Sequence, residues 1–152
     1  MNVTNTIWLD ATRLILLAAV IGYAAWKDHQ TGEVSNKVWI YAPFGLCLTF
    51  LNCILNPELL LVTLLSFGSA TVISFTIFYL GGWGGADAKA FLTIAASLPV
   101  TPFIPFNLVF MYPLNVILIS VILAFAVAKI RHVKTVRFLP YVMVALFVAI
   151  AV

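Results

Sequence analysis

Charged residues are grouped along the chain so that long apolar segments lie between them. Three uncharged stretches cover residues 38–57, 59–86 and 90–128, and shorter ones lie near both ends. A helix needs about 20 apolar residues to cross the hydrocarbon core of a bilayer. The pattern therefore predicts that the first three membrane spans cover approximately residues 8–26, 38–55 and 59–80.

The longest uncharged stretch, residues 90–128, exceeds the length of one helix and contains a cluster of prolines, Pro99, Pro102 and Pro105. Prolines interrupt helices, so this stretch predicts two spans. The fourth covers approximately residues 87–105, with its helix ending near residue 98 and part of the Pro-rich connection at membrane depth. The fifth and sixth spans cover approximately residues 107–129 and 138–152. The expected fold class is all-α, a bundle of six transmembrane helices in a single membrane-embedded domain over residues 1–152.

Composition agrees with a membrane protein and excludes several other classes. Hydrophobic residues make up 64% of the chain, charged residues only 9%, and the mean hydropathy is +1.14. Soluble domains have about a quarter charged residues. Eight Lys and Arg residues in so apolar a chain predict membrane orientation rather than nucleic-acid binding. The expected partners are therefore the lipid bilayer and no nucleic acid.

Basic residues are distributed unequally between the two sides of the predicted bundle. Cytoplasmic loops are rich in Lys and Arg, and placing the N-terminus outside leaves only Arg13 on the outer side. The inner side then holds Lys27, Lys37, Lys89, Lys129, Arg131, Lys134 and Arg137. This orientation places Asp28, at the end of the first span, and Asp87, at the start of the fourth, on the same cytoplasmic side.

Charged side chains at membrane depth are unfavourable without a partner or a function. Glu58 follows a predicted outer turn, and Asp10 lies beside Arg13 at the outer interface, so both acids are interpreted as solvated. Glu33 lies in the loop of residues 27–37. It has the same interpretation, with possible contact to a basic substrate segment.

Asp87 differs because it follows the run Gly81-Gly82-Trp83-Gly84-Gly85-Ala86, which contains four of the eight glycines of the chain. Glycine permits positive φ and a close approach of the backbone to a ligand. The structural alternative is a flexible turn with Asp87 as a helix N-cap. For Asp28 the alternative is a weak surface pair with Lys27 or Lys37.

Two aspartates that meet across the bundle can share one proton. The ionised carboxylate then takes a proton from water, and the protonated partner polarises a peptide carbonyl. This chemistry requires no metal and no cofactor. The dipole of the predicted fourth helix favours charge at its N-terminus, which predicts that Asp87 is ionised and Asp28 carries the proton.

With these residues the chain resembles the GxGD aspartic proteases of membranes, in particular type IV prepilin peptidases and archaeal preflagellin peptidases. The resemblance covers nearly the whole chain: six spans, one aspartate after the first helix, and a second in a Gly-x-Gly-Asp motif that opens the fourth. The matching positions are Asp28 and the segment Gly84-Gly85-Ala86-Asp87-Ala88-Lys89. Val34-Ser35-Asn36 stands where bacterial relatives carry Ile-Pro-Asn, and Phe138-Leu139-Pro140-Tyr141 is similar to the opening of the family's last helix.

The resemblance implies an aspartic endopeptidase with Asp28 and Asp87 as catalytic residues and Gly84, Gly85, Ala86 and Lys89 in the active-site loop. Its implied substrates are type IV pilin-like or archaellin precursors, from which it removes a short basic leader peptide at the cytoplasmic face. Members that also methylate the new N-terminus carry an additional cytoplasmic segment, often with paired CxxC motifs. This chain has neither, which implies cleavage without methylation. The substrate and the oligomeric state are not predicted further.

Ala86 departs from the motif because it stands where the family has its second glycine. If that position required positive φ, alanine would strain the loop by about 1 kcal/mol.

Two further functions are compatible with the sequence. A small multi-pass transporter or channel component could use the paired carboxylates as an ion or proton site, and would show flux without cleavage. A purely structural membrane subunit would require both aspartates to be dispensable.

Overall fold

A computed structural model describes residues 3–98, 112–131 and 137–151. These residues form six α-helices and two 3-10 helices, without a β-strand, which confirms the all-α fold class. In chain order they are α1 (Val3–Thr31), η1 (Asn36–Ile40), α2 (Tyr41–Leu55), η2 (Pro57–Leu59), α3 (Leu60–Tyr79), α4 (Gly85–Ser97), α6 (Tyr112–Arg131) and α7 (Leu139–Ala151).

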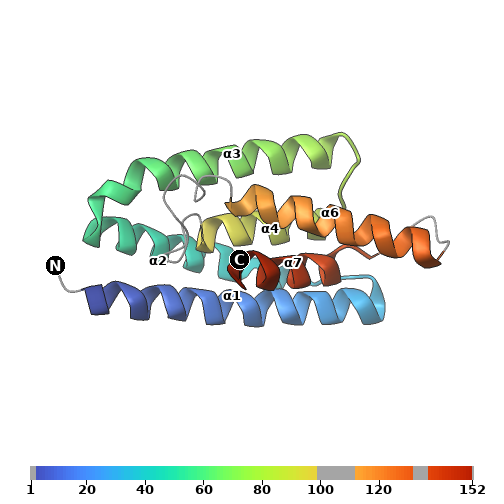
Figure 1. Cartoon of the computed structure of the whole chain (residues 1–152), viewed down its shortest axis with the longest axis horizontal. Coiled ribbons are helices and arrows are strands. Elements are labelled where there is room, and N and C mark those ends of the chain that lie inside the picture. The colour runs from blue at the N-terminus through green and yellow to red at the C-terminus, as the bar shows by residue number, and fades with distance from the viewer. Residues whose placement is uncertain (1–2, 99–111, 132–136, 152) are drawn as a thin grey trace.

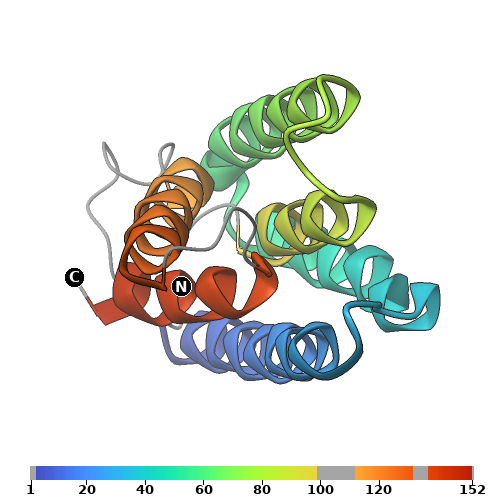
Figure 2. The ribbon, with the colours of Figure 1, turned by 90° about the vertical axis from the view of Figure 1, so that its right-hand side faces the viewer.

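The helices form an elongated bundle in which successive helices run in opposite directions (Figure 1). Viewed along the bundle, α4 lies between α2 and α3 on one side and α1 and α7 on the other (Figure 2). It contacts each of the other described α-helices. As a result, nearly every residue of α4 after Lys89 is buried, and the position of its first turn is fixed by the whole bundle.

Among the described residues, three helical segments have the length and apolar composition needed to cross a membrane: Trp8–Thr31, Asn36–Leu55 and Pro57–Tyr79. Leu139–Val148 is a shorter apolar helix. The 13 residues of α4 extend only about 20 Å, less than one crossing. The six-span topology and the outer position of the N-terminus stay predictions, and residues 99–111, which include the three clustered prolines, lie outside the described residues.

Small residues and hydroxyl groups mediate the packing of α4. The Ser74 hydroxyl of α3 donates to the Ala88 carbonyl at 3.1 Å, and the Thr49 hydroxyl of α2 donates to the Ala96 carbonyl at 2.7 Å. A Cβ atom added to Gly45 would lie 2.3 Å from the Ser97 hydroxyl oxygen, so α2 and α4 approach very closely. Such contacts are typical of helices that pack without a hydrophobic driving force. They hold α4 near both of its ends.

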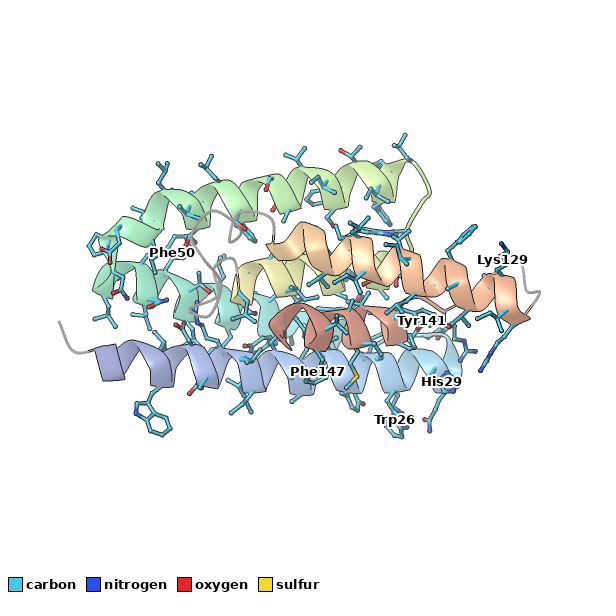
Figure 3. All side chains as sticks on the ribbon, viewed as in Figure 1. Trp26, His29, Phe50, Lys129, Tyr141 and Phe147 are labelled. Atoms are coloured by element: carbon cyan, nitrogen blue, oxygen red, sulfur yellow. The ribbon has the colours of Figure 1, made fainter. Side chains whose placement is uncertain are left out.

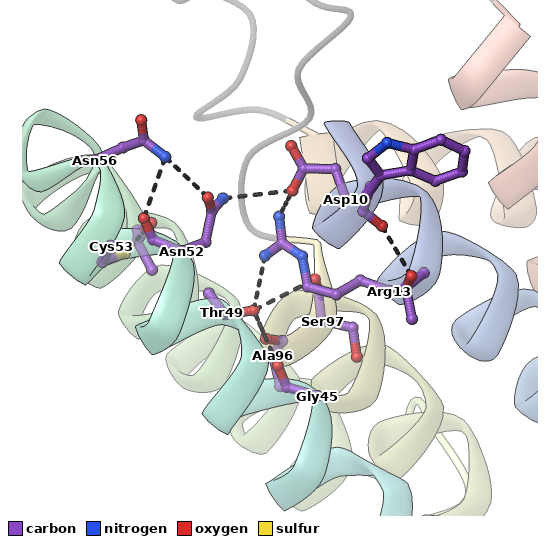
Figure 4. A network of polar contacts seen from close by, with 12 residues as sticks. Asp10, Arg13, Gly45, Thr49, Asn52, Cys53, Asn56, Ala96 and Ser97 are labelled. Carbon is purple, nitrogen blue, oxygen red and sulfur yellow. Dashed lines mark hydrogen bonds and ion pairs between the residues drawn. The ribbon is translucent and has the colours of Figure 1, made fainter. Parts of the chain in front are cut away.

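Asp10 is buried, in contrast to the expectation that it is solvated at the outer interface, and Arg13 is buried beside it. The two residues are 7% and 1% exposed, and their side chains form an ion pair. Arg13 also donates to Thr49 at 3.1 Å, and the Asn52 amide donates to Asp10 at 3.3 Å (Figure 4). The prediction was wrong because α1 packs against α2 along this face, where each charged group finds a polar partner.

Candidate active site

Asp87 lies in the first turn of α4, directly after the glycine-rich connection from α3. Gly81 in this connection has a φ of 75°, a conformation that favours glycine. Its N–H and that of Gly82 donate to carbonyls of the last turn of α3, which ends the helix. The Asp87 carboxylate accepts a hydrogen bond from the Gly84 N–H at 3.1 Å. Gly84, not Asp87, is therefore the N-cap of α4.

Ala86 belongs to the helical first turn of α4. The position therefore adopts a helical φ, and the strain considered for alanine in place of the motif glycine does not arise. Within the glycine-rich run, positive φ is found at Gly81, five residues before Ala86.

Asp28 and Asp87 line one cavity of about 460 Å³, which we call the aspartate cavity. Its lining residues belong to the end of α1, the start of α4 and the segments beside them, and Figure 1 shows that α1 ends and α4 and α7 begin at the same end of the bundle. Of the predicted site residues, Gly84, Gly85 and Ala86 also line it. The remaining lining residues are Gly32, Glu33, Val34, Arg137 and Phe138. Figure 3 shows His29 of α1 and Lys129 of α6 at this end, far from Phe50 of α2.

Lys89 does not line the cavity. Its ammonium group donates to the Asn36 side-chain carbonyl at 2.6 Å. This hydrogen bond joins α4 to the segment between α1 and α2, which supplies Glu33 and Val34 to the cavity.

Arg137 is a site residue that the sequence argument missed, because it was counted there only as a cytoplasmic charge. It hydrogen-bonds the His29 carbonyl and interacts electrostatically with Asp28. The backbone N–H of Leu139, the first residue of α7, also interacts with the Asp28 carboxylate. The available signal was the position of Arg137 directly before the family-like segment Phe138–Tyr141.

The two aspartates differ in their electrostatic surroundings. Asp87 lies outside the three candidate membrane spans. Burial raises the pKa of its carboxyl group to about 6, the Gly84 N–H partly opposes this, and the charge of Asp28 adds to it. Burial disfavours a charged Asp28 carboxylate, whereas the charge of Arg137 and the backbone N–H of Leu139 favour it. The raised pKa of Asp87 argues against the predicted division, in which Asp87 is ionised and Asp28 carries the proton.

The sequence model of the type IV leader peptidase family matches residues 15–151. The chain belongs to this family. Membership confirms the resemblance and supports a leader peptidase role, with pilin-like precursors as the general substrate class. Together with the three apolar helices, it indicates a membrane protein. No curated protein and no solved structure matches the chain.

Proposed function

We propose that this leader peptidase family member is an aspartic endopeptidase in which Asp28 and Asp87 activate a water molecule. The observation that carries the proposal is their position on one cavity, close enough for the charge of Asp28 to raise the pKa of Asp87. Perturbed carboxyl groups that face a common cavity are typical of catalytic acid and base pairs.

In the proposed reaction the ionised Asp28 takes a proton from water, and the water oxygen attacks the peptide carbonyl carbon. The protonated Asp87 donates its proton to the carbonyl oxygen, which gives a tetrahedral diol. When the C–N bond breaks, the proton on Asp28 passes to the leaving nitrogen, and Asp87 recovers a proton from the diol hydroxyl. The pair ends with one shared proton, as it began.

We place this reaction at the cytoplasmic face and infer that it removes leader peptides from pilin-like or archaellin precursors. The distribution of Lys and Arg supports the orientation. The absence of CxxC motifs from the sequence supports cleavage without N-methylation.

Cleavage of a precursor tests the proposal directly. The protein is co-expressed with a tagged pilin-like or archaellin-like precursor, and the shortened product is measured for the Asp28→Asn and Asp87→Asn variants. Glu58→Gln is the matched control because its carboxylate lies in η2, at the other end of the bundle. We expect each aspartate variant to lose at least roughly 1,000-fold of the cleavage rate at normal membrane levels, and the control to retain it. Cleavage by either aspartate variant at the control's rate contradicts the dyad, and proton or ion flux then becomes the function to measure.

A further inference from the structure

Asp28 lies in the last turn of α1, a place where a negatively charged side chain is unfavourable. The last carbonyl groups of a helix have no partners inside the helix, and they give this end a partial negative charge. The Asp28 carbonyl accepts a hydrogen bond from the Gly32 N–H at 2.9 Å, and Gly32 ends the helix with a φ of 76°. An ionised Asp28 carboxylate therefore needs positive charge from another part of the chain.

Arg137 brings positive charge to this end of α1. Its guanidinium group donates to the His29 carbonyl, one of the last four of the helix. It also lies over Gly32, where an added Cβ atom would be 3.5 Å from the Arg137 Nη2 atom. Arg137 and Asp28 line the aspartate cavity together and interact electrostatically. Because the guanidinium group is bound to the backbone of α1, its charge is held beside Asp28 although the side chain is exposed.

The backbone supports both aspartates in a similar way. Asp87 accepts a hydrogen bond from the Gly84 N–H at the N-cap of α4. Asp28 interacts with the N–H of Leu139, the first residue of α7. Each carboxyl group thus faces one helix N-terminus, which favours its ionised form. The backbone alone therefore does not determine which of the two carries a proton.

No cation comparable to Arg137 accompanies Asp87 among the described residues. Asp87 forms no ion pair there, and the Lys89 ammonium group donates to Asn36 and does not line the cavity. His29 of α1 acts electrostatically on Asp28. The charged residues that line the aspartate cavity are Asp28, Glu33, Asp87 and Arg137. Positive charge at the site is therefore concentrated beside one aspartate.

We propose that Arg137 is a positioning residue that determines which aspartate carries the shared proton. Its charge favours an ionised Asp28 and leaves the proton on Asp87, the state from which the proposed reaction begins. This inference rests on the proposed function, because it takes the two aspartates as a pair that holds one proton. Arg137 acts through Asp28 and not on the substrate.

The position of the proton can be measured without a substrate. The chain contains three aspartates, Asp10, Asp28 and Asp87, so protein labelled with carbon-13 at the aspartate carboxyl carbon gives three signals in a nuclear magnetic resonance spectrum. Each signal is assigned at high pH by its loss in the corresponding aspartate-to-asparagine variant, and the protein is then titrated in detergent. As the pair takes up its first proton, we expect the Asp87 signal to move and the Asp28 signal to stay at the position of a carboxylate.

Three variants of arginine residues test the role of the charge. Arg137→Gln keeps an N–H donor for the His29 carbonyl but removes the charge, so we expect both aspartate signals to move together in the first step. Arg137→Lys keeps the charge and should retain the original pattern. Arg131→Gln is the matched control, because Arg131 is an exposed arginine in the last turn of α6 that does not line the aspartate cavity.

Cleavage of a precursor gives a second measurement on the same variants. We expect Arg137→Gln to lower kcat about tenfold without a change in KM, because solvent partly screens the charge of an exposed arginine. Arg137→Lys and Arg131→Gln should retain most of kcat. A rise in KM with kcat unchanged would mean that Arg137 contacts the substrate, and equal losses of kcat in Arg137→Gln and Arg137→Lys would mean that charge is not its role. Either result overturns the proposal.

The two measurements separate this inference from the proposed function. If the protein cleaves a precursor but the aspartate signals of Arg137→Gln titrate like those of the unaltered protein, the inference is wrong and the proposed function stands. The inference is also wrong if the Asp28 signal moves with that of Asp87 in the unaltered protein. If no precursor is cleaved but the signals change as expected, the proposed function fails and the role of Arg137 in placing the proton stands.

Discussion

Polar side chains pair with one another at one end of the bundle, whereas at the other end they line a cavity. Asp10, Arg13, Thr49 and Asn52 form the Arg13 network, in which buried groups pair with one another and with α4 (Figure 4). In the aspartate cavity the carboxyl groups line an open space, and burial raises the pKa of Asp87 to about 6. The carboxyl groups that differ most are Asp10 and Asp87. Asp10 forms an ion pair with Arg13, whereas among the described residues Asp87 has no ion-pair partner and accepts a hydrogen bond from the Gly84 N–H.

This difference indicates that the Arg13 network stabilises the packing of the helices, whereas the aspartate cavity is suited to proton transfer. In the Arg13 network the Thr49 hydroxyl accepts a hydrogen bond from Arg13 and donates one to the Ala96 carbonyl, so the network ties α1 and α2 to the last turn of α4. A carboxylate held by Arg13 and Asn52 is stabilised in its charged form and is poorly suited to move protons. At the other end of α4, Asp87 faces a cavity and burial raises the pKa of its carboxyl group, which suits the acid catalyst proposed for it.

The largest expected effect on stability comes from breaking the Arg13 network. Arg13→Met removes the cationic partner and leaves the Asp10 carboxylate buried, so we expect the free energy of unfolding to fall by about 3 kcal/mol. Thermal unfolding in detergent measures this loss. The double variant Asp10→Asn/Arg13→Met should recover part of it because no unpaired charge remains. Asp87→Asn should leave the unfolding temperature unchanged or raise it, and equal destabilisation by Asp87→Asn and Arg13→Met would contradict the comparison.

The next effect is the pH dependence of cleavage. The raised pKa of Asp87, about 6, means that the folded protein holds the acid proton below this pH and releases it above. We expect kcat/KM to fall roughly tenfold for each pH unit above about 6. The protonated Asp87 carboxyl group also contributes to the free energy of unfolding. This contribution is present at low pH and is lost as the pH rises through about 6.

Cleavage rates between about pH 5 and pH 8 measure this limb. The protonated carboxyl band in the infrared spectrum follows the same titration without substrate, and Asp87→Asn identifies its source by removing it. Asp28→Asn removes the neighbouring negative charge and should shift the band's titration to lower pH. A rate that is constant over this range would contradict the assignment of the proton to Asp87.

Part of this arrangement was predictable from the sequence. Charge-free stretches predicted the all-α class, and the glycine run before Asp87, together with Asp28, predicted the family that the match confirms. Contacts between residues far apart in the sequence were not predictable. Hydrophobic periodicity and charge indicate on which side of the membrane a residue lies, but they do not indicate how the helices pack against one another. The bonds from Arg13 to Thr49 and from Arg137 to His29 join residues 36 and 108 positions apart.

The hydrogen bond between Lys89 and Asn36 is another such contact and gives a smaller expected effect. It holds the segment that carries Glu33 against α4, so Lys89→Met should lower kcat/KM about fivefold, mainly through KM, in line with about 1 kcal/mol for one hydrogen bond. Asn36→Asp keeps the acceptor and should retain most activity. Lys37→Met is the matched control, because among the described residues the Lys37 side chain has no hydrogen bond or ion pair. Equal losses for both lysine variants would indicate a general charge effect instead.

The smallest effect is expected at Ala86, the position where the chain departs from the family motif. Because Ala86 lies in a helical turn, Ala86→Gly removes no strain, and the free energy of unfolding should fall by about 0.5 kcal/mol through the lower helix propensity of glycine. Cleavage should stay within about twofold, since this loss of helix propensity leaves the contacts of Asp87 in place. Gly81→Ala is the comparison variant. Because Gly81 has a φ of 75°, alanine there should lower the free energy of unfolding by about 1 kcal/mol. If Ala86→Gly instead increased cleavage several-fold while Gly81→Ala had no effect, the motif glycine, and not the turn at Gly81, would set the position of Asp87.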